Sequence, residues 1–125
     1  ICPGQIGQYA ALWGMQNLDQ WLAGERDEIL ARRAAISAGF HRLEKHGWKL
    51  LGLGAYFAYL AHPFDQSSAD LAPRMVTECG LLCLPGTMFT PPDDPSGAQQ
   101  LRIAFANLDA DGIDTLFARL ESWAG

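Results

Sequence analysis

Arg102 is the side chain best placed to do chemistry in this sequence of 125 residues. It lies in the segment 101–107, where side chains of two kinds alternate and predict a strand with unlike faces. The bulky face carries Leu101, Ile103 and Phe105. The other face sets Arg102 beside two alanines, so that its fixed fork of donors stands on a floor of methyl groups.

Two interpretations of Arg102 follow from this pattern. An anion pocket is one, because an arginine pairs with a carboxylate through two parallel hydrogen bonds. An ordinary solvated or ion-paired arginine is the other. A long loop rich in proline and glycine, residues 85–99, leads directly into the strand. Loops of this length in a compact domain are often functional, which favours the pocket.

An aromatic segment, residues 55–61, is the second candidate. Its near-continuous hydrophobicity predicts a strand covered on both faces. Core packing is the simpler interpretation of its aromatic side chains. The more specific interpretation makes Tyr56 the wall of a pocket.

Other kinds of site have little support. The three histidines and three cysteines share no metal-ligand spacing. Gly52-x-Gly54 precedes a strand and lacks a third glycine, so it does not predict a phosphate cradle. Lys45 and Lys49 occupy solvated positions, whereas an imine-forming lysine needs burial or a neighbouring charge to lower its pKa. We therefore expect no metal site in this sequence.

Composition narrows the class of protein. The net charge is −5 and no cluster of lysine and arginine occurs, which argues against nucleic-acid binding. Neither a secretory leader nor a membrane span is predicted. An odd number of irregularly spaced cysteines is typical of free thiols, so we expect a cytoplasmic protein. Because the first residue is isoleucine, we expect a chain cut from a longer one.

Periodicity and caps predict an α+β domain, with helices packed against one sheet. The expected helices cover residues 5–22, 25–46 and 71–79, with a final helix whose apolar stripe runs from Ile113 to Leu120. The expected strands cover 48–51, 55–61, 81–84 and 101–107. Gly24 is expected to break or bend the helical run between the first two helices. Gly47 is expected to end the second helix. Asp70 as N-cap would place Pro73 harmlessly in the first turn of the third helix. Asp109 is the expected N-cap of the last helix.

These segments together resemble the C-terminal signature of the class I/II aminotransferases, the pyridoxal-phosphate enzymes of the aspartate aminotransferase fold (fold type I). The specific part is Leu84–Phe89 (LPGTMF), then an acidic loop, then Leu101–Asn107 (LRIAFAN). Gly54–Tyr59 is similar to the family's aromatic strand, and Asp70–Gly80 to the helix before its Pro-Gly-x-x-Phe turn. The match covers essentially the whole chain in the right order.

The resemblance implies roles for a few residues. Arg102 matches the arginine that binds the α-carboxylate of the substrate, and Tyr56 matches an aromatic position near the substrate. Gly86 and Phe89 match the turn beside the active site and would shape it. The family's catalytic lysine, its other cofactor-contacting groups and most of its phosphate ligands belong to a large domain and have no counterpart here.

The resemblance also implies a parent protein. Residues 1–23 would be the helix leaving the large domain, and 24–125 the C-terminal small domain with a small mixed or antiparallel sheet. The parent would be a homodimeric, pyridoxal 5'-phosphate-dependent transaminase of amino acid metabolism, acting on an amino acid and a 2-oxo acid. We expect the 125-residue chain alone to bind no cofactor and to be inactive.

Two alternatives remain open from the sequence. One is a free-standing α+β module that binds a small carboxylate without catalysis. The other is a different fold type I enzyme, a lyase or synthase, or a regulator. A first helix with exposed aromatic surface would favour a part of a larger enzyme, whereas a well-buried first helix would favour the module.

Overall fold

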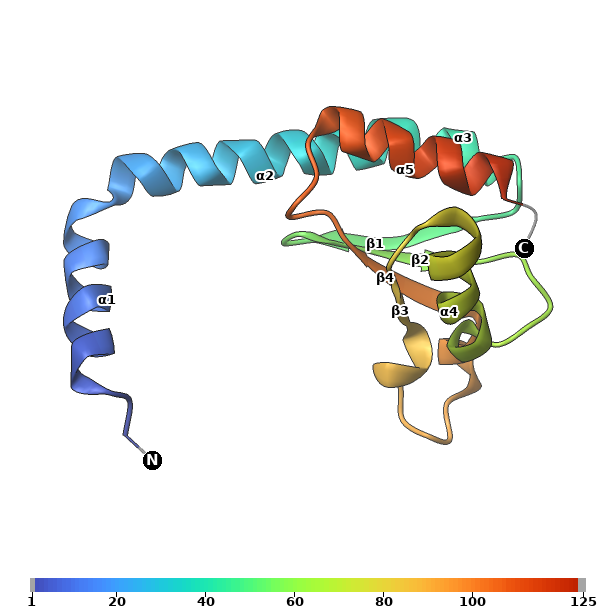
Figure 1. Cartoon of the computed structure of the whole chain (residues 1–125), viewed down its shortest axis with the longest axis horizontal. Coiled ribbons are helices and arrows are strands. Elements are labelled where there is room, and N and C mark those ends of the chain that lie inside the picture. Colours follow the sequence, from blue (N-terminus) through green and yellow to red (C-terminus); the bar gives the residue numbers. More distant parts are fainter. Residues whose placement is uncertain (1, 124–125) are drawn as a thin grey trace.

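The computed structural model describes residues 2–123, and Figure 1 shows an α+β arrangement, as predicted. The helices are α1 (Gln5–Asn17), α2 (Asp19–Gly39), α3 (His41–Glu44), α4 (Ser68–Cys79) and α5 (Ala110–Ser122). The strands are β1 (Lys49–Gly54), β2 (Phe57–Ala61), β3 (Leu84–Pro85) and β4 (Gln100–Ala104). Two short 3-10 helices, η1 (Gly86–Met88) and η2 (Pro95–Gln99), lie between β3 and β4.

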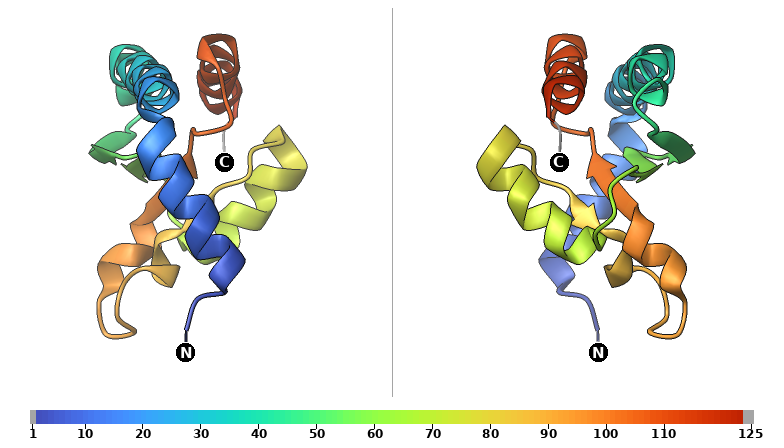
Figure 2. Two further views of the ribbon diagram at one scale, coloured as in Figure 1. Left: turned by 90° about the vertical axis from the view of Figure 1, so that its left-hand side faces the viewer. Right: turned by 90° about the vertical axis from the view of Figure 1, so that its right-hand side faces the viewer.

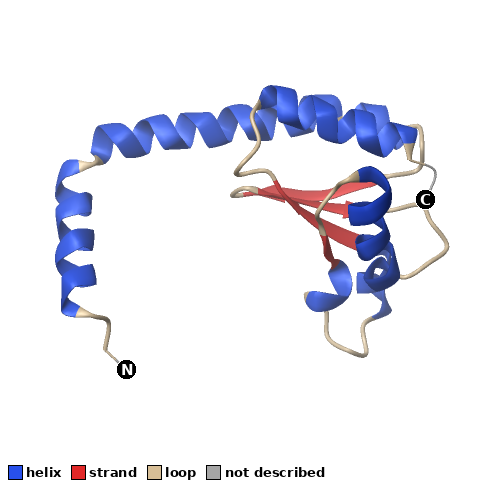
Figure 3. Cartoon of the chain, viewed as in Figure 1, coloured by secondary structure: helices blue, strands red, loops and turns tan. Residues whose placement is uncertain are grey.

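The four strands form one antiparallel sheet in the order β1-β2-β4-β3 (Figure 3). Strand β4 therefore lies between β2 and the two-residue strand β3. Arg102 pairs with Tyr59 on one side and with Leu84 on the other. A register shift between Leu50 and Gly52 makes β1 irregular.

One face of the sheet carries the core. The alternation predicted for residues 101–107 is confirmed for its bulky face, because Leu101, Ile103 and Phe105 are all buried, although β4 itself ends at Ala104. Ala58 and Leu60 of β2 share this face through their pairing with Ile103 and Leu101. Helices α2, α3, α4 and α5 all contribute to the same buried cluster, so the helices lie on one side of the sheet (Figure 2).

The opposite face is open. Phe57 and Tyr59 of β2 and Arg102 of β4 alternate with the core residues and are only half-buried. In Figure 2, α2, α4 and α5 lie on the other side of the sheet. This open face holds both chemically interesting segments of the sequence.

The N-terminal arm, defined here as residues 5–28, extends away from the sheet (Figure 1). Helix α1 contains no buried residue. Large apolar side chains are instead exposed along the arm: Ile6, Tyr9, Leu12, Trp13, Met15, Trp21 and Leu22. An apolar surface of this size on a soluble domain marks a site of contact with another surface.

The predicted helix break at Gly24 is wrong. The two helices are separated at Leu18, and α2 continues through Gly24. Asn17 donates from its side-chain amide to the carbonyl of Trp13, which ends α1 locally. Asp19 then begins α2, where its charge suits the positive end of the helix dipole. The proposed division into residues 1–23 and 24–125 stays a prediction, and residues 1 and 124–125 lie outside the described chain.

The predicted helix over 25–46 is also divided, because α2 ends at Gly39 and α3 follows. Gly39 lies against Phe117 of α5, and a Cβ at this position would come within 2.4 Å of the ring. The glycine thus lets α5 approach the helix backbone. Gly47 has φ +86°, the left-handed conformation expected of it, but it follows a turn rather than the helix itself.

Two capping predictions have different outcomes. Asp109 is the N-cap of α5 and accepts from the Gly112 N–H at 2.8 Å, as predicted. Asp70 is not the cap of α4, which begins earlier with Ser67 accepting from the N–H of Ala69. Pro73 consequently lies inside the helix rather than in its first turn. The buried Ser68 donates to the Gly97 carbonyl at 2.8 Å, so this helix start is set by a tertiary contact.

Candidate functional site

Arg102 lies on the open face between two aromatic rings. Its Cζ atom is 4.4 Å from the centroid of the Phe57 ring and 4.1 Å from that of Phe89. Both distances are within the range of cation–π contacts. The sequence predicted that Arg102 lies beside alanine side chains. In the structure, two aromatic rings also flank its guanidinium.

Strand pairing brings Phe57 to this position. Phe57 pairs with Ala104, two residues beyond Arg102, and β2 presents it on the open face. The small Ala104 leaves room for the ring to lean toward the guanidinium. The sequence contained this signal, since Phe57 and Tyr59 have the two-residue spacing of one strand face, but the neighbouring strand could not be assigned without the fold.

A close glycine contact brings Phe89 to the other wall. A Cβ on Gly86 would come within 2.6 Å of the Gly97 carbonyl oxygen, and one on Gly97 within 2.2 Å of Thr90 Oγ1. Only glycine at both positions allows η1 and η2 to pack this tightly. Phe89 follows η1 directly, with its N–H donating to the Gly86 carbonyl at 2.8 Å.

The predicted loop over 85–99 is not irregular throughout. It is folded into η1 and η2 and connects the Pro-Gly-x-x-Phe motif to the Arg102 strand through direct contacts. Leu84 pairs with Arg102 and Pro85 with Leu101. The two sequence motifs are one structural unit.

The guanidinium of Arg102 has no carboxylate partner in the described chain. No salt bridge or side-chain hydrogen bond within residues 2–123 includes it. Arg42 and Arg74, by contrast, are both paired with acidic side chains. Arg102 thus combines a charge, two aromatic walls and unused donors, which is the chemistry of an anion site.

Tyr56 is connected to the site around Arg102 through Phe57. It lies in the turn of the β1–β2 hairpin, next to Ala55, which adopts φ +48°. The Tyr56 and Phe57 ring centroids are 5.4 Å apart, and the Tyr56 carbonyl accepts from the Phe105 N–H at 2.9 Å. Tyr56 itself lines a hollow of about 700 Å³ between the hairpin and α2, together with Trp21 and Ile29. The structure therefore links Tyr56 to Arg102 indirectly, with Phe57 between them.

An arginine missed by the sequence analysis fixes the far end of this unit. Arg32 of α2 donates to the Ala106 carbonyl, just beyond β4. It also pairs with Glu28, one helical turn away, at 3.3 Å. Its contact with Ala106 joins positions 74 residues apart, so the sequence carried no local signal for it.

The described residues do not fit the role of cofactor holder. Lys45 Nζ is 3.1 Å from Glu121 Oε1, and Lys49 is exposed at the end of the hairpin opposite Phe57. Neither offers the buried amine that imine chemistry needs. Burial raises the pKa of Cys83 to about 11, which keeps that thiol protonated. Within residues 2–123 no three His, Cys, Asp or Glu side chains are grouped to hold a metal ion.

His62 is buried and lies outside the site around Arg102. Its Nε2 lies 3.1 Å from the Ala98 carbonyl oxygen, which can only accept, so this nitrogen carries a proton. Desolvation lowers its pKa. In the described chain, no helix has both the length and the apolar character needed to cross a bilayer.

A family model gives the decisive comparison, because the model of the class I and II aminotransferases matches residues 3–120. The chain belongs to the class I and II aminotransferase family. No curated protein matches it.

Solved aminotransferases share the fold. A putative aminotransferase from Silicibacter pomeroyi is 27% identical with a TM-score of 0.79, over 98% of this chain and 32% of that one. N-succinyldiaminopimelate aminotransferase from Mycobacterium tuberculosis is 25% identical with a TM-score of 0.74, over 91% of this chain and 29% of that one. Alanine aminotransferase from Pyrococcus furiosus, at 20% identity, shows the fold alone. Its TM-score is 0.76, over 96% of this chain and 30% of that one. The chain spans about a third of the length of these aminotransferases.

Proposed function

We propose that this segment is the C-terminal small domain of a pyridoxal-phosphate-dependent aminotransferase and binds the α-carboxylate of its substrate. The substrates of the parent would be an amino acid and a 2-oxo acid. The observation that carries the proposal is Arg102, a cation between two rings with no acidic partner in the described chain.

The role of Arg102 would be orientation. A bidentate arginine–carboxylate pair fixes both the position and the plane of one end of the substrate. Pyridoxal phosphate, when bound in the parent, supplies the electron sink for the amino-group transfer. The chain's own residues offer no lysine for it, so the cofactor would be held by other parts of the parent, and the 125-residue chain alone would be inactive.

The N-terminal arm supports the enzyme over a free-standing module. Trp13 is 59% exposed and Trp21 57% exposed, on helices with almost no buried side chains. A self-contained binding module would cover such surface with its own residues. The proposed partners of the arm are the large domain and the second subunit of a cytoplasmic homodimer.

Arg102→Ala in the full-length aminotransferase that carries this segment tests the proposal. We expect KM for every amino acid and 2-oxo acid in a panel to rise by about a hundredfold, because a charge-assisted bidentate pair is lost. Arg102→Lys keeps the charge and is expected to recover only part of the loss. Steady-state kinetics measure both.

Arg42→Ala is the matched control, since it removes an arginine of the same domain that is already paired with Glu121. We expect it to leave KM unchanged. Wild-type kinetics in Arg102→Ala would refute the assignment of the carboxylate site.

A further inference from the structure

The two rings around Arg102 reach it from opposite sides of its strand. Phe57 comes from β2 and Phe89 from the turn after β3, and β4 lies between these two strands. Each ring centroid is about 4 Å from the same Cζ atom, at 4.4 and 4.1 Å. We propose that Phe57 and Phe89 are positioning residues that fix the plane of the Arg102 guanidinium, so that only its edge is offered to a carboxylate.

This inference deepens the proposed function and rests on it. An arginine side chain has several rotatable bonds, and its order must come from its neighbours. Acidic partners supply that order elsewhere in the domain, as Glu78 does for Arg74. Arg102 has no such partner in residues 2–123, and an acidic partner would also compete with an anionic ligand. Aromatic faces hold the cation without using its N–H donors.

The two walls differ in how they are held. Phe57 is half-buried and belongs to a strand with neighbours on both sides. Phe89 is 43% exposed, and its position depends on the glycine contact between η1 and η2. A rigid wall and a surface wall leave the guanidinium open along one edge. This geometry suits a planar carboxylate that approaches in the plane of the guanidinium.

The test uses Phe57→Leu and Phe89→Leu in the same full-length enzyme. Leucine keeps an apolar side chain but has no ring face for the cation. We expect KM for amino acid and 2-oxo acid substrates to rise by about 3- to 30-fold in each variant, with kcat changed less than about twofold. Phe89→Tyr, which restores a ring, is expected to return KM to near the wild-type value.

Phe64→Leu is the control, because Phe64 is a half-buried aromatic residue that packs on Trp48 and Trp123 and not on Arg102. Its KM is expected to stay at the wild-type value. A second readout follows the Arg102 Nε–H signal by NMR. Ring faces on both sides shift this signal upfield, and we expect Phe89→Leu to move it downfield even without substrate.

The outcomes separate the two proposals. A large KM effect of Arg102→Ala together with wild-type KM in both leucine variants would overturn the positioning role and keep the carboxylate site. No effect of Arg102→Ala would overturn both. A KM effect in Phe89→Leu that tyrosine does not rescue, with an unmoved Nε–H signal, would also count against positioning, because it would reflect a general disturbance of the loop.

Discussion

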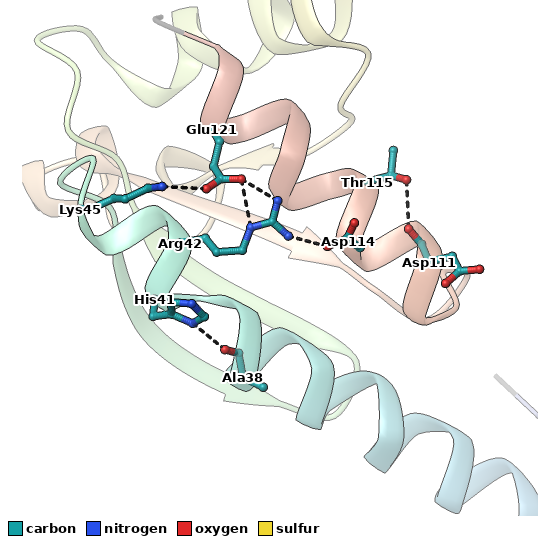
Figure 4. A network of polar contacts seen from close by, with 8 residues as sticks. All are labelled: Ala38, His41, Arg42, Lys45, Asp111, Asp114, Thr115 and Glu121. Atoms are coloured by element: carbon teal, nitrogen blue, oxygen red, sulfur yellow. Dashed lines mark hydrogen bonds and ion pairs between the residues drawn. The ribbon is translucent and has the colours of Figure 1, made fainter.

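Arg42 and Arg102 each lie near a phenylalanine ring, but the rest of their surroundings differ. Arg42 of α3 donates from Nε to Glu121 Oε2 at 3.0 Å and pairs with Asp114 as well, both on α5 (Figure 4). Lys45 adds a second cation to Glu121. Arg102, on the open face, lies between two rings and has no ion pair within the described chain.

The difference separates an arginine that is paired with acidic side chains from one that has no acidic partner in the described chain. On the helix side, the Arg42 network joins two helices and leaves little capacity for a further anion. On the open side, the Arg102 donors remain unused by the described residues. A count of arginines would treat the two alike, whereas their partners within the described chain differ.

The largest expected contrast concerns the rings beside these arginines. Phe117 lies 5.7 Å from the Arg42 Cζ, is buried, and packs against Gly39 and Phe40. We expect Phe117→Ala to lower the free energy of unfolding by about 3–5 kcal/mol, because it leaves a cavity between α2 and α5. Urea denaturation followed by circular dichroism measures it.

Phe89→Ala is the matched variant on the open face. Phe89 is 43% exposed, so its loss is expected to cost less than about 1 kcal/mol of unfolding free energy. Equal losses in the two variants would remove the distinction between a structural side and an open side.

A pH titration tests the network of Figure 4. Hydrogen bonds from Arg42 and Lys45 lower the pKa of Glu121 from 4.5 to about 2. A carboxyl whose pKa is depressed by folding stabilises the folded state above its unfolded pKa and loses that contribution as it becomes protonated. The contribution is therefore expected to be complete above about pH 4.5 and to disappear between pH 4.5 and 2.

Glu121→Gln isolates this contribution. Melting temperatures of the wild type and the variant should differ at pH 6 and converge toward pH 2. A difference that persists unchanged at pH 2 would assign the effect to packing instead of charge. For a substitution of Arg102, the difference in melting temperature from the wild type is expected to be the same at pH 6 and at pH 2.

The smallest expected effect lies in the hairpin turn that carries Tyr56. Ala55 has φ +48°, where a side chain is strained and glycine is not. Ala55→Gly should raise the free energy of unfolding by about 0.5–1 kcal/mol, because it removes this strain. Thermal unfolding checks it, and a loss of stability would show that the turn depends on the alanine side chain.

The sequence predicted the parts of the fold that depend on local patterns. The alternating faces of 101–105, the Asp109 cap and the final helix are decided by neighbours along the chain, and the structure confirms them. The breaks at Leu18 and Gly39 were missed. A close approach of Phe117, distant in sequence, accompanies the second break.

The candidate site shows the same division. Arg102 was a candidate from its strand, with a solvated arginine as the alternative, and Phe89 was a candidate from the family resemblance. The position of Phe57 beside Arg102 was missed, because it depends on β2 and β4 being neighbours. The tight contact of Gly86 with Gly97 was likewise invisible, since it joins two turns 11 positions apart.

The exposed arm also gives the chain a built-in optical probe. Two of the four tryptophans of the chain, Trp13 and Trp21, lie on the arm in contact with water. Trp48, in the core, is only 2% exposed. Indole emission from the arm should therefore be red-shifted and accessible to a quencher such as acrylamide. Any surface that covers the arm would shift that emission to the blue and protect it, so binding to the arm can be followed without a label.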